Sequence, residues 1–316
     1  MRPALFQLFG ESAPAYFVML AVGFLFATAV GVQWARRIGE SADVIVDLSL
    51  AMLLAGLVGS RILHVLADGF FMDYVHACTN PALVDWHIER GECVSESYRG
   101  VWDAAAGVCH PAERDCLAWA KFWNGGLTYY GGFLGASAVA VFVLRRDRFP
   151  FWRAADMSAF AIPLGLAFGR LGCLLAGCCF GAQTNAWWGI SFPPRSAASE
   201  AQYKAHALAS SHLWSTPVHP TQVYESVASL AIAAFCFFVV HPRKRYDGHV
   251  FAWMLALYAV ARFGVEILRR DDRGGALGLS TSQLISIGLF ACAAALHAKK
   301  SRTLATLPPS PSEISR

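Results

Sequence analysis

The sequence predicts an all-α polytopic membrane protein with about seven transmembrane helices, its N-terminus outside and its C-terminus in the cytoplasm. Hydrophobic residues make up 56% of the 316 residues and charged residues only 15%, which is too apolar for an ordinary soluble protein. Several apolar windows are long enough to cross about 30 Å of hydrocarbon as helices. Lys and Arg cluster in alternate connections between those windows.

The predicted spans share a length of about 20 residues and a continuous apolar character. They run over residues 16–35, 44–66, 125–144, 154–177, 217–240, 250–268 and 282–298. The first, third and seventh contain no Asp, Glu, Lys or Arg, whereas the other four carry charges inside the apolar stretch. We interpret the first group as structural spans and the second group as the spans that build a site. The first span is too long for a cleaved signal peptide, and its cations follow the apolar run.

The orientation follows from the cations, because Lys and Arg in short loops stay cytoplasmic. The cations after the first, third, fifth and seventh spans are Arg36, Arg37, Arg145, Arg146, Arg148, Arg153, Arg243, Lys244, Arg245, Lys299, Lys300 and Arg302. They all fall on one side. The exception is the outer connection 269–273, where Asp271 and Asp272 partly offset three arginines. The net charge of +4 is thus a topological signal, and it predicts no nucleic-acid partner.

We predict one membrane domain over residues 1–298, with an extracytoplasmic insertion at 69–124 and a disordered, Pro/Ser-rich cytoplasmic tail at 299–316. The insertion holds four cysteines, Cys78, Cys93, Cys109 and Cys116. In an oxidising compartment these predict two disulfides, with three pairings open. A zinc site with His76 and His110 is disfavoured, because the insertion has no CxxC spacing.

A second group of cysteines, Cys173, Cys178 and Cys179, ends the fourth span in GRLGCLLAGCCFG. On an unbroken helix residues 173 and 178 lie about 140° apart, which is poor geometry for shared ligation, although Gly177 could end the helix there. We favour the interpretation that these cysteines pack as small apolar residues. A disulfide or redox role comes second and a metal site last, so no metal is predicted.

Three arginines lie inside apolar spans, and a guanidinium at bilayer depth indicates a functional site. They are Arg61, Arg170 and Arg262, and the predicted chain direction places all of them in the outer leaflet. Arg61 is close enough to its span end to snorkel. These three arginines outnumber the acidic residues Glu225 and Glu266, which leaves an excess of positive charge. Arg262 and Glu266 could form an i,i+4 pair. The pocket should bind an anion, which in a bilayer is most simply a lipid phosphate.

The motifs around these residues resemble the prolipoprotein diacylglyceryl transferase family. Gly169, Arg170, Gly172, Gly177 and Gly181 fall on its signature. HPTQVYE, KFWNGGLTYYGG and YAVARFGVEILRRDD match three further family segments, and GSRILHVL and AYFVML match less closely. Three polar positions differ: Cys173 and Cys178 stand where the family usually has Asn and Glu, and Tyr130 stands where many members have His.

The resemblance implies transfer of the diacylglyceryl group of phosphatidylglycerol to the lipobox cysteine of a prolipoprotein signal peptide, with release of glycerol phosphate. It implies a bacterial inner membrane location, an active site toward the outer leaflet, and no cofactor. The implied catalytic residues are Arg170, Arg262, Tyr130, Glu225 and His219. The implied substrate-binding residues are Arg170, Arg61, Tyr16, Tyr258, Gln222, Gly172 and Gly181. His219 capping a helix and Glu225 pairing with an arginine are the simpler structural interpretations.

Two other classes of function stay open from the residues alone. A membrane thiol-disulfide oxidoreductase would use the outer cysteines and would not need the arginines. A non-catalytic lipid-binding protein would bind or move phosphatidylglycerol without releasing glycerol phosphate.

Overall fold

A computed structural model of the chain describes residues 4–8, 11–88, 90–95, 98–122, 126–269, 275–276 and 278–305. Within this part, six helices are long and apolar enough to cross a membrane. They are α1 (Ala15–Arg37), α2 (Ala42–Ala67), α6 (Phe151–Ala176), α8 with its continuation (Thr221–Arg243), α9 (His249–Ile267) and α10 (Thr281–Ala305). A further helix, α5 (Tyr129–Arg146), has 18 residues and is about 27 Å long. The all-α membrane fold is confirmed, and the count of seven spans and the orientation of the termini stay predictions.

The span boundaries predicted from hydropathy lie close to those of the observed helices. The third predicted span begins at 125 whereas α5 begins at Tyr129, and the boundaries of the other early spans differ by similar or smaller amounts. The fifth predicted span, 217–240, contains α8 proper (Thr221–Phe235) and a π-helical turn η4 (Cys236–Val240), and the 3₁₀ turn η5 (His241–Arg243) follows it. The last helix continues to Ala305, so the first residues of the predicted tail are helical. Residues 306–316 lie outside the described residues.

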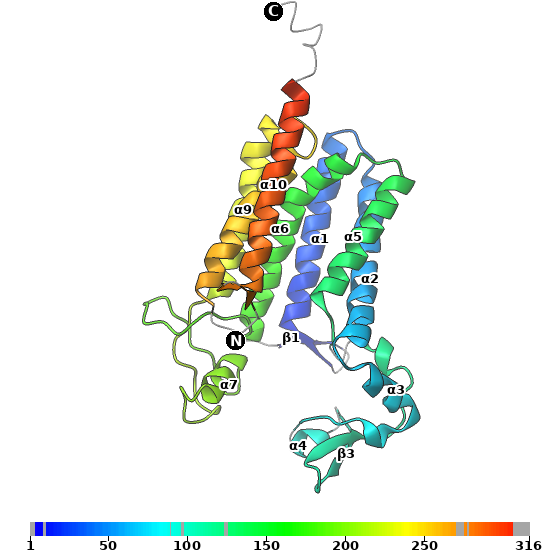
Figure 1. Cartoon of the computed structure of the whole chain (residues 1–316), viewed down its shortest axis with the longest axis vertical. Helices are drawn as coiled ribbons and strands as arrows, with labels where there is room; N and C mark the ends of the chain where they lie inside the picture. Colours follow the sequence, from blue (N-terminus) through cyan, green and yellow to red (C-terminus); the bar gives the residue numbers. More distant parts are fainter. Residues whose placement is uncertain are drawn as a thin grey trace, which may run out of the picture. The chain divides into compact units, whose positions relative to one another are not determined.

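The chain divides into two compact units. The first contains residues 1–45 and 150–316, and the second contains residues 46–149. In the first unit α1, α6, α9 and α10 run side by side (Figure 1). Glycines set the closest approach between α1 and α6: a Cβ on Gly23 would lie 2.7 Å from Cβ of Phe168, and one on Gly172 would lie 3.2 Å from Cα of Tyr16. This small-residue contact is typical of helices that pack in membranes.

A buried carboxylate joins α6 to the start of α9. Asp156 is 0% exposed, and its Oδ1 accepts hydrogen bonds from the backbone N–H groups of Val250 and Phe251 at 2.9 and 3.1 Å. Its Oδ2 accepts from Gly248 N at 2.9 Å, and Lys244 Nζ lies 3.4 Å away. Asp156 therefore caps α9 from a neighbouring helix, satisfying N–H groups that a helix start leaves unpaired.

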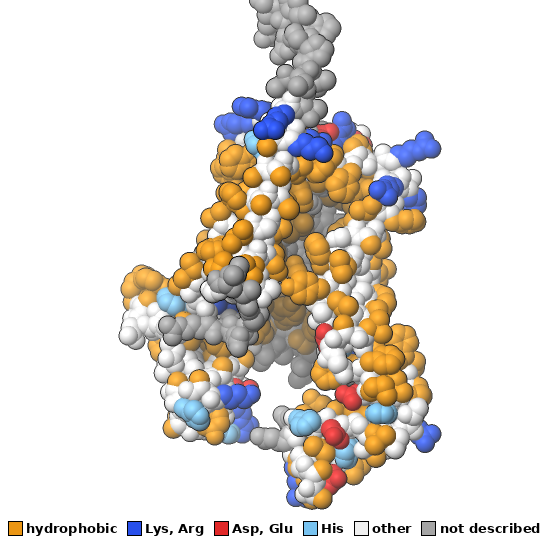
Figure 2. All heavy atoms as spheres, viewed as in Figure 1, with side chains coloured by type: hydrophobic (Ala, Val, Ile, Leu, Met, Phe, Trp, Pro, Cys, Tyr) orange, Lys and Arg blue, Asp and Glu red, His pale blue; other side chains and the backbone are white. Residues whose placement is uncertain are grey.

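Cations gather at this same end of the first unit (Figure 2). Arg153 at the start of α6 contacts Glu40 at 2.6 Å, just beyond α1, and Asp247 at 3.4 Å, just before α9. Lys300 near the end of α10 lies 4.7 Å from the ring centroid of Trp152. These contacts bring together the ends of the helices that carry the predicted cytoplasmic cations, as the charge bias of the loops requires.

The other end of the first unit carries short elements and a long connection. The strands β1 (Ala4–Leu8) and β2 (Glu11–Pro14) pair antiparallel, as do β5 (Gly275–Ala276) and β6 (Leu279–Ser280). The connection between α6 and α8 contains α7 (Ala197–Lys204), whose start is closed by a capping box between Ser196 and Ser199. It has a small core of Phe192, Ala198 and Val218. The sequence analysis did not predict this folded connection.

In the second unit, glycines let α2 and α5 pack closely. A Cβ on Gly59 would lie 2.5 Å from the carbonyl oxygen of Gly131, and one on Gly56 would lie 3.6 Å from that of Gly132. The insertion that follows α2 contains α3 (Phe71–Thr79), η1 (Pro81–Leu83), α4 (Arg90–Cys93), β3 (Gly100–Asp103), β4 (Val108–Pro111) and η2 (Ala118–Ala120).

Two disulfides close the insertion, as predicted. They join Cys78 to Cys116 and Cys93 to Cys109, which selects one of the three open pairings. Because all four sulfurs are in disulfides, they cannot serve as thiolate ligands for zinc. His110 instead contacts the Val84 carbonyl at 2.9 Å and Asp85 at 3.4 Å.

The Asp156 cap generates a stability prediction. Asp156→Ala should lower the free energy of unfolding by about 2–3 kcal/mol, because it leaves buried N–H groups of α9 unsatisfied. Thermal or denaturant unfolding of the purified protein in detergent measures this change. The control is Asp43→Ala in the exposed first turn of α2, which should cost less than about 1 kcal/mol. Equal losses in the two variants would show that Asp156 has no special role.

Candidate functional site

The arginines of the fourth and sixth predicted spans come together in the first unit, at the end opposite the cation cluster. Arg170 lies near the end of α6, Arg262 near the end of α9, and Glu225 in the second turn of α8. Because α8 starts at this end while α6 and α9 finish there, residues far apart in sequence meet at one depth. The convergence predicted for Arg170, Arg262 and Glu225 is present in the structure.

Glu225 is the centre of this cluster. Its Oε2 lies 2.6 Å from Nε of Arg170. Its Oε1 lies 3.6 Å from Nη1 of Arg262 and 3.5 Å from Nη1 of Arg269. Glu225 is 8% exposed and Arg269 is 7% exposed, so these charges interact where solvent screens them little. One carboxylate thus orients three guanidinium groups from three segments.

Arg262 has a second set of partners. Its Nη1 lies 2.8 Å from Oε2 of Glu266, the i,i+4 pair expected from sequence. Its Nη2 donates to Oγ of Ser282 at 3.0 Å at the start of α10, and Ser280 donates to the other oxygen of Glu266 at 2.9 Å. The guanidinium of Arg262 is therefore held from α8, α9 and α10 at once.

Among the described residues, ion pairs join Arg170, Arg262 and Arg269 to Glu225, and a further pair joins Arg262 to Glu266. Several of the buried atoms in this cluster form no hydrogen bond of good geometry within the described residues, including Oε1 of Glu225, Nη1 of Arg262 and Oε2 of Glu266. Buried polar atoms without hydrogen bonds are unfavourable unless a ligand or water satisfies them. An anion with several oxygens would supply acceptors to the guanidinium groups.

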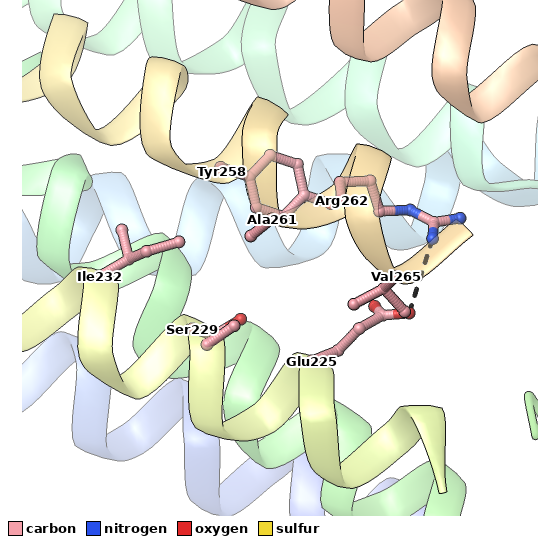
Figure 3. Close-up of a pocket in the computed structure, with 8 residues that line it drawn as sticks. Glu225, Ser229, Ile232, Tyr258, Ala261, Arg262 and Val265 are labelled. Atoms are coloured by element: carbon pink, nitrogen blue, oxygen red, sulfur yellow. Dashed lines mark ion pairs between the residues drawn. The ribbon is translucent and has the colours of Figure 1, made fainter. Parts of the chain in front are cut away.

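A hollow between α8 and α9 opens beside this cluster (Figure 3). Glu225 and Arg262 face each other at its polar end, and the rest of the wall is mainly apolar (Figure 3). The lining residues are Glu225, Ala228, Ser229, Ile232, Tyr258, Ala261, Arg262 and Val265. The wall is charged at one end and mainly apolar beyond it, as the two parts of a lipid molecule are. Tyr258, which the resemblance implies to be a substrate-binding residue, lies in this wall.

The HPTQVYE motif, residues 219–225, forms the start of α8. His219 Nδ1 lies 3.2 Å from the Tyr224 hydroxyl, which also accepts a hydrogen bond from Trp188 Nε1 at 2.7 Å. Thr221 donates to the Cys179 carbonyl at 2.7 Å, and Gln222 Nε2 donates to the Cys178 carbonyl at 2.6 Å. Gln222, predicted to bind substrate, therefore holds the turn that follows α6.

Gly172 and Gly181, which the resemblance implies to be substrate-binding residues, have packing roles in the structure. A Cβ on Gly181 would lie 2.8 Å from the Leu268 carbonyl oxygen and from Cγ2 of Thr221. Gly181 N donates to the His219 carbonyl at 2.9 Å. Gly172 faces Tyr16 across the α1 and α6 contact, and Tyr16 is 36% exposed. These positions bring the backbones close enough for the motifs to meet.

Arg61 lies in the second unit, where the backbone holds its guanidinium. Its Nε, Nη1 and Nη2 donate to the carbonyl oxygens of Trp119, Gly126 and Ala118 at 2.6, 3.1 and 2.7 Å, and it lies 5.2 Å from the ring centroid of Tyr74. These contacts indicate that Arg61 shapes the connection before α5. Tyr130 is 53% exposed in the first turn of α5, and residues 123–125 of the KFWNGG segment lie outside the described residues.

Sequence reasoning missed Arg269 as a member of the site. The signal was present, because Arg269 belongs to the predicted outer connection, whose cations contradict the charge bias of the loops. In the structure Arg269 has Glu225 as a partner. No sequence feature pointed to Ser280 and Ser282 as partners of Glu266 and Arg262, since serines in a short connection are common. Residues 270–273 of the same connection lie outside the described residues.

Comparison with known proteins supports the motif resemblance. The family model of prolipoprotein diacylglyceryl transferase matches residues 3–92 and 98–299. The chain belongs to this family. A Clostridium perfringens relative named phosphatidylglycerol–prolipoprotein diacylglyceryl transferase 2 is 26% identical over 91% of this chain and 91% of its own length.

Other relatives carry the same kind of name. A phosphatidylglycerol–prolipoprotein diacylglyceryl transferase of Clostridium tetani is 26% identical over 92% of this chain and 96% of its own length. One from Geobacter sulfurreducens is 34% identical over 53% of this chain and 59% of its own length. The family thus covers both units of this chain, including α1 through α10.

The Arg61 contacts generate a prediction. Arg61→Lys should lower the free energy of unfolding by about 1–3 kcal/mol, because an ammonium cannot reach three carbonyl oxygens in the fork geometry of a guanidinium. Hydrogen–deuterium exchange should speed up at residues 118–122, and thermal unfolding in detergent measures the stability. The control is Arg114→Lys at an exposed position of the same insertion, which should change neither. Unchanged exchange in Arg61→Lys would refute this role.

Proposed function

We propose that this chain transfers the diacylglyceryl group of phosphatidylglycerol to the lipobox cysteine thiol of prolipoproteins. Family membership supports the reaction class. The observation that carries the proposal for this chain is the convergence of Arg170 and Arg262 on Glu225, where several buried polar atoms form no hydrogen bond within the described residues, beside a largely apolar hollow. Such a site fits the headgroup of an acidic phospholipid better than it fits thiol-disulfide exchange, which has no need of buried guanidinium groups.

The reaction forms one bond and breaks one bond. The acceptor sulfur attacks the glyceryl carbon that carries the phosphate, the C–O bond to the phosphate breaks, and a C–S thioether forms. Glycerol phosphate leaves with the bonding electron pair, and the thiol proton passes through a base to the leaving phosphate or to water. Arg170 and Arg262, joined by Arg269, stabilise the charge that develops on the phosphate oxygens.

Glu225 acts as the positioning residue for this clamp. Both of its oxygens face guanidinium groups, which suits a counter-ion and leaves little access for a thiol proton. Of the three base candidates, His219 is the one in the first unit that is not engaged in ion pairs with the clamp; its Nδ1 side is oriented by Tyr224. We assign it the proton transfer, since a thiol needs deprotonation to attack efficiently at neutral pH.

The protein would work in the bacterial inner membrane with this site toward the outer leaflet. The cation cluster at the opposite end of the first unit supports this orientation, as do the two disulfides of the insertion, which belong in an oxidising compartment. Phosphatidylglycerol would then reach the hollow from the outer leaflet, and the signal peptide of the prolipoprotein would present its cysteine at the same depth.

The clamp predicts a large kinetic effect. Arg170→Ala should lower transfer from labelled phosphatidylglycerol to a lipobox peptide at least about 100-fold, because a preorganised charged donor is lost. Release of glycerol phosphate should fall in parallel. Arg153→Ala, which removes an arginine from ion pairs at the cation end, should transfer at close to the wild-type rate. Full transfer by a folded Arg170→Ala protein would remove the clamp, and lipid binding with no glycerol phosphate release by wild type would favour a non-catalytic lipid-binding protein.

The orientation can be tested separately from the chemistry. Alkaline phosphatase is active only outside the cytoplasm, so its fusion after Ser210, in the connection between α6 and α8, should be active. Fusion after Ala305 at the end of α10 should be inactive, and a fluorescent protein at that place should fluoresce. The opposite pattern would put the site in the inner leaflet and would contradict the proposed access of the prolipoprotein.

A further inference from the structure

A cluster of three free thiols lies next to the arginine site in the first unit. Cys173, Cys178 and Cys179 place their sulfur atoms within 4.8 Å of one another. All three are free cysteines, in contrast to the four disulfide-bonded cysteines of the insertion. Cys173 is buried and the other two are partly exposed, so one side of the cluster is accessible. Nothing in the transferase chemistry uses these thiols.

The backbone turns sharply to bring the thiols together. The helix α6 ends at Ala176, and Gly177 follows with φ of 74°. Cys179 also has a positive φ, of 62°, a conformation that costs a non-glycine residue about 1–2 kcal/mol. Cys178 N donates to the Cys173 carbonyl at 3.1 Å within this turn. The wide separation expected on an unbroken helix therefore does not apply, and the objection that the sequence raised against shared ligation is removed.

Buried side chains of α8 hold this turn in place. Thr221 and Gln222 donate to the carbonyl oxygens of Cys179 and Cys178, and they are 0% and 1% exposed. Two independent hydrogen bonds from a neighbouring helix thus support a strained residue. Strain that the surrounding structure maintains in this way is typical of functional positions.

Two cations near the cluster favour a thiolate at Cys179. Arg170 lies one helical turn before Cys173, and both Arg170 and Arg269 interact electrostatically with Cys179. Three thiolates in an apolar environment would need such compensation. A redox pair would need only two cysteines, whereas three sulfurs converging on one point form a ligand set.

We propose that Cys173, Cys178 and Cys179 bind a single thiophilic d¹⁰ metal ion, Zn²⁺ or Cu⁺, as three thiolates. Thiolate sulfur is a preferred ligand of both ions. Binding releases one proton from each thiol, which turns Zn²⁺ and three thiols into a site of net charge −1 and Cu⁺ and three thiols into a site of net charge −2. The neighbouring guanidinium groups offset this negative charge. The proposal does not depend on the transferase reaction.

The test follows protection of the thiols in the full-length wild-type protein. The protein, reduced and purified in detergent under anaerobic conditions, receives Zn²⁺ alone or Cu⁺ alone, and a maleimide then alkylates the accessible thiols. Mass spectrometry of the peptides should show that one equivalent of at least one ion slows alkylation of Cys178 and Cys179 at least about 10-fold. Exposed Cys292 should react at the same rate with and without metal, which provides an internal control.

Variants then identify the ligands. Cys173→Ser, Cys178→Ser and Cys179→Ser should each weaken binding of the protecting ion at least about 10-fold, as loss of a ligand should exceed the effect of a lost outer-shell partner. Cys236→Ser and Cys292→Ser, at the two free cysteines outside the cluster, should leave binding unchanged. Circular dichroism in detergent confirms that each variant is helical.

Absence of protection by both ions in the wild-type protein would overturn the proposal, whether or not the variants fold. Protection that persists in a Cys173→Ser, Cys178→Ser, Cys179→Ser triple variant at another thiol would also overturn it. A disulfide between two of the three cysteines in protein isolated without reductant, together with no protection after reduction, would assign the cluster to redox chemistry instead. Protection by one ion and not the other supports the proposal and identifies the metal.

Discussion

The contact of one carboxylate with three guanidinium groups determines how the first unit is arranged at its functional end. Glu225 reaches Arg170 on α6, Arg262 on α9 and Arg269 beyond α9. Burying any one of these charges without a partner would be very costly. The ends of α6, α8 and α9 must therefore meet for the chain to fold. The same requirement gathers guanidinium groups in one place, so the arrangement that permits folding also prepares the site to bind an anion.

The hydrophobic pattern predicted the helices well because membrane spans obey one simple constraint. Backbone groups in hydrocarbon must be satisfied within the helix, so length and apolar composition locate the ends of α1 and α6 to within three residues. The charge bias of the loops similarly identified Arg153 and Lys300 as residues of one end. Neither signal contains information about which helix lies beside which. The pairing of Arg170 with Glu225 and the division into two units depend on packing between spans distant in sequence.

Two parts of the site show what local sequence cannot reveal. Arg61 fits the pattern of a buried functional arginine as well as Arg170 does, yet its three donors are used by backbone carbonyls of Ala118, Trp119 and Gly126. Cys173 and Cys178 would lie far apart on an unbroken helix, and the sequence left open whether the helix ends at Gly177; in the structure it does, and Gly177 and Cys179 both adopt positive φ. In each case the decisive fact is the path of the backbone, which the side-chain pattern does not encode.

The first turn and a half of α8 contacts both the arginine site and the cluster of three thiols. Thr221 and Gln222 hold the turn that carries Cys178 and Cys179, and Glu225 one turn later holds Arg170. Since Arg170 and Cys173 belong to the same last turns of α6, a shift of α8 along α6 would move the thiols and the guanidinium together. Besides supplying His219, the HPTQVYE motif therefore has a structural role, because its buried side chains hold both the turn after α6 and Arg170 of the arginine site.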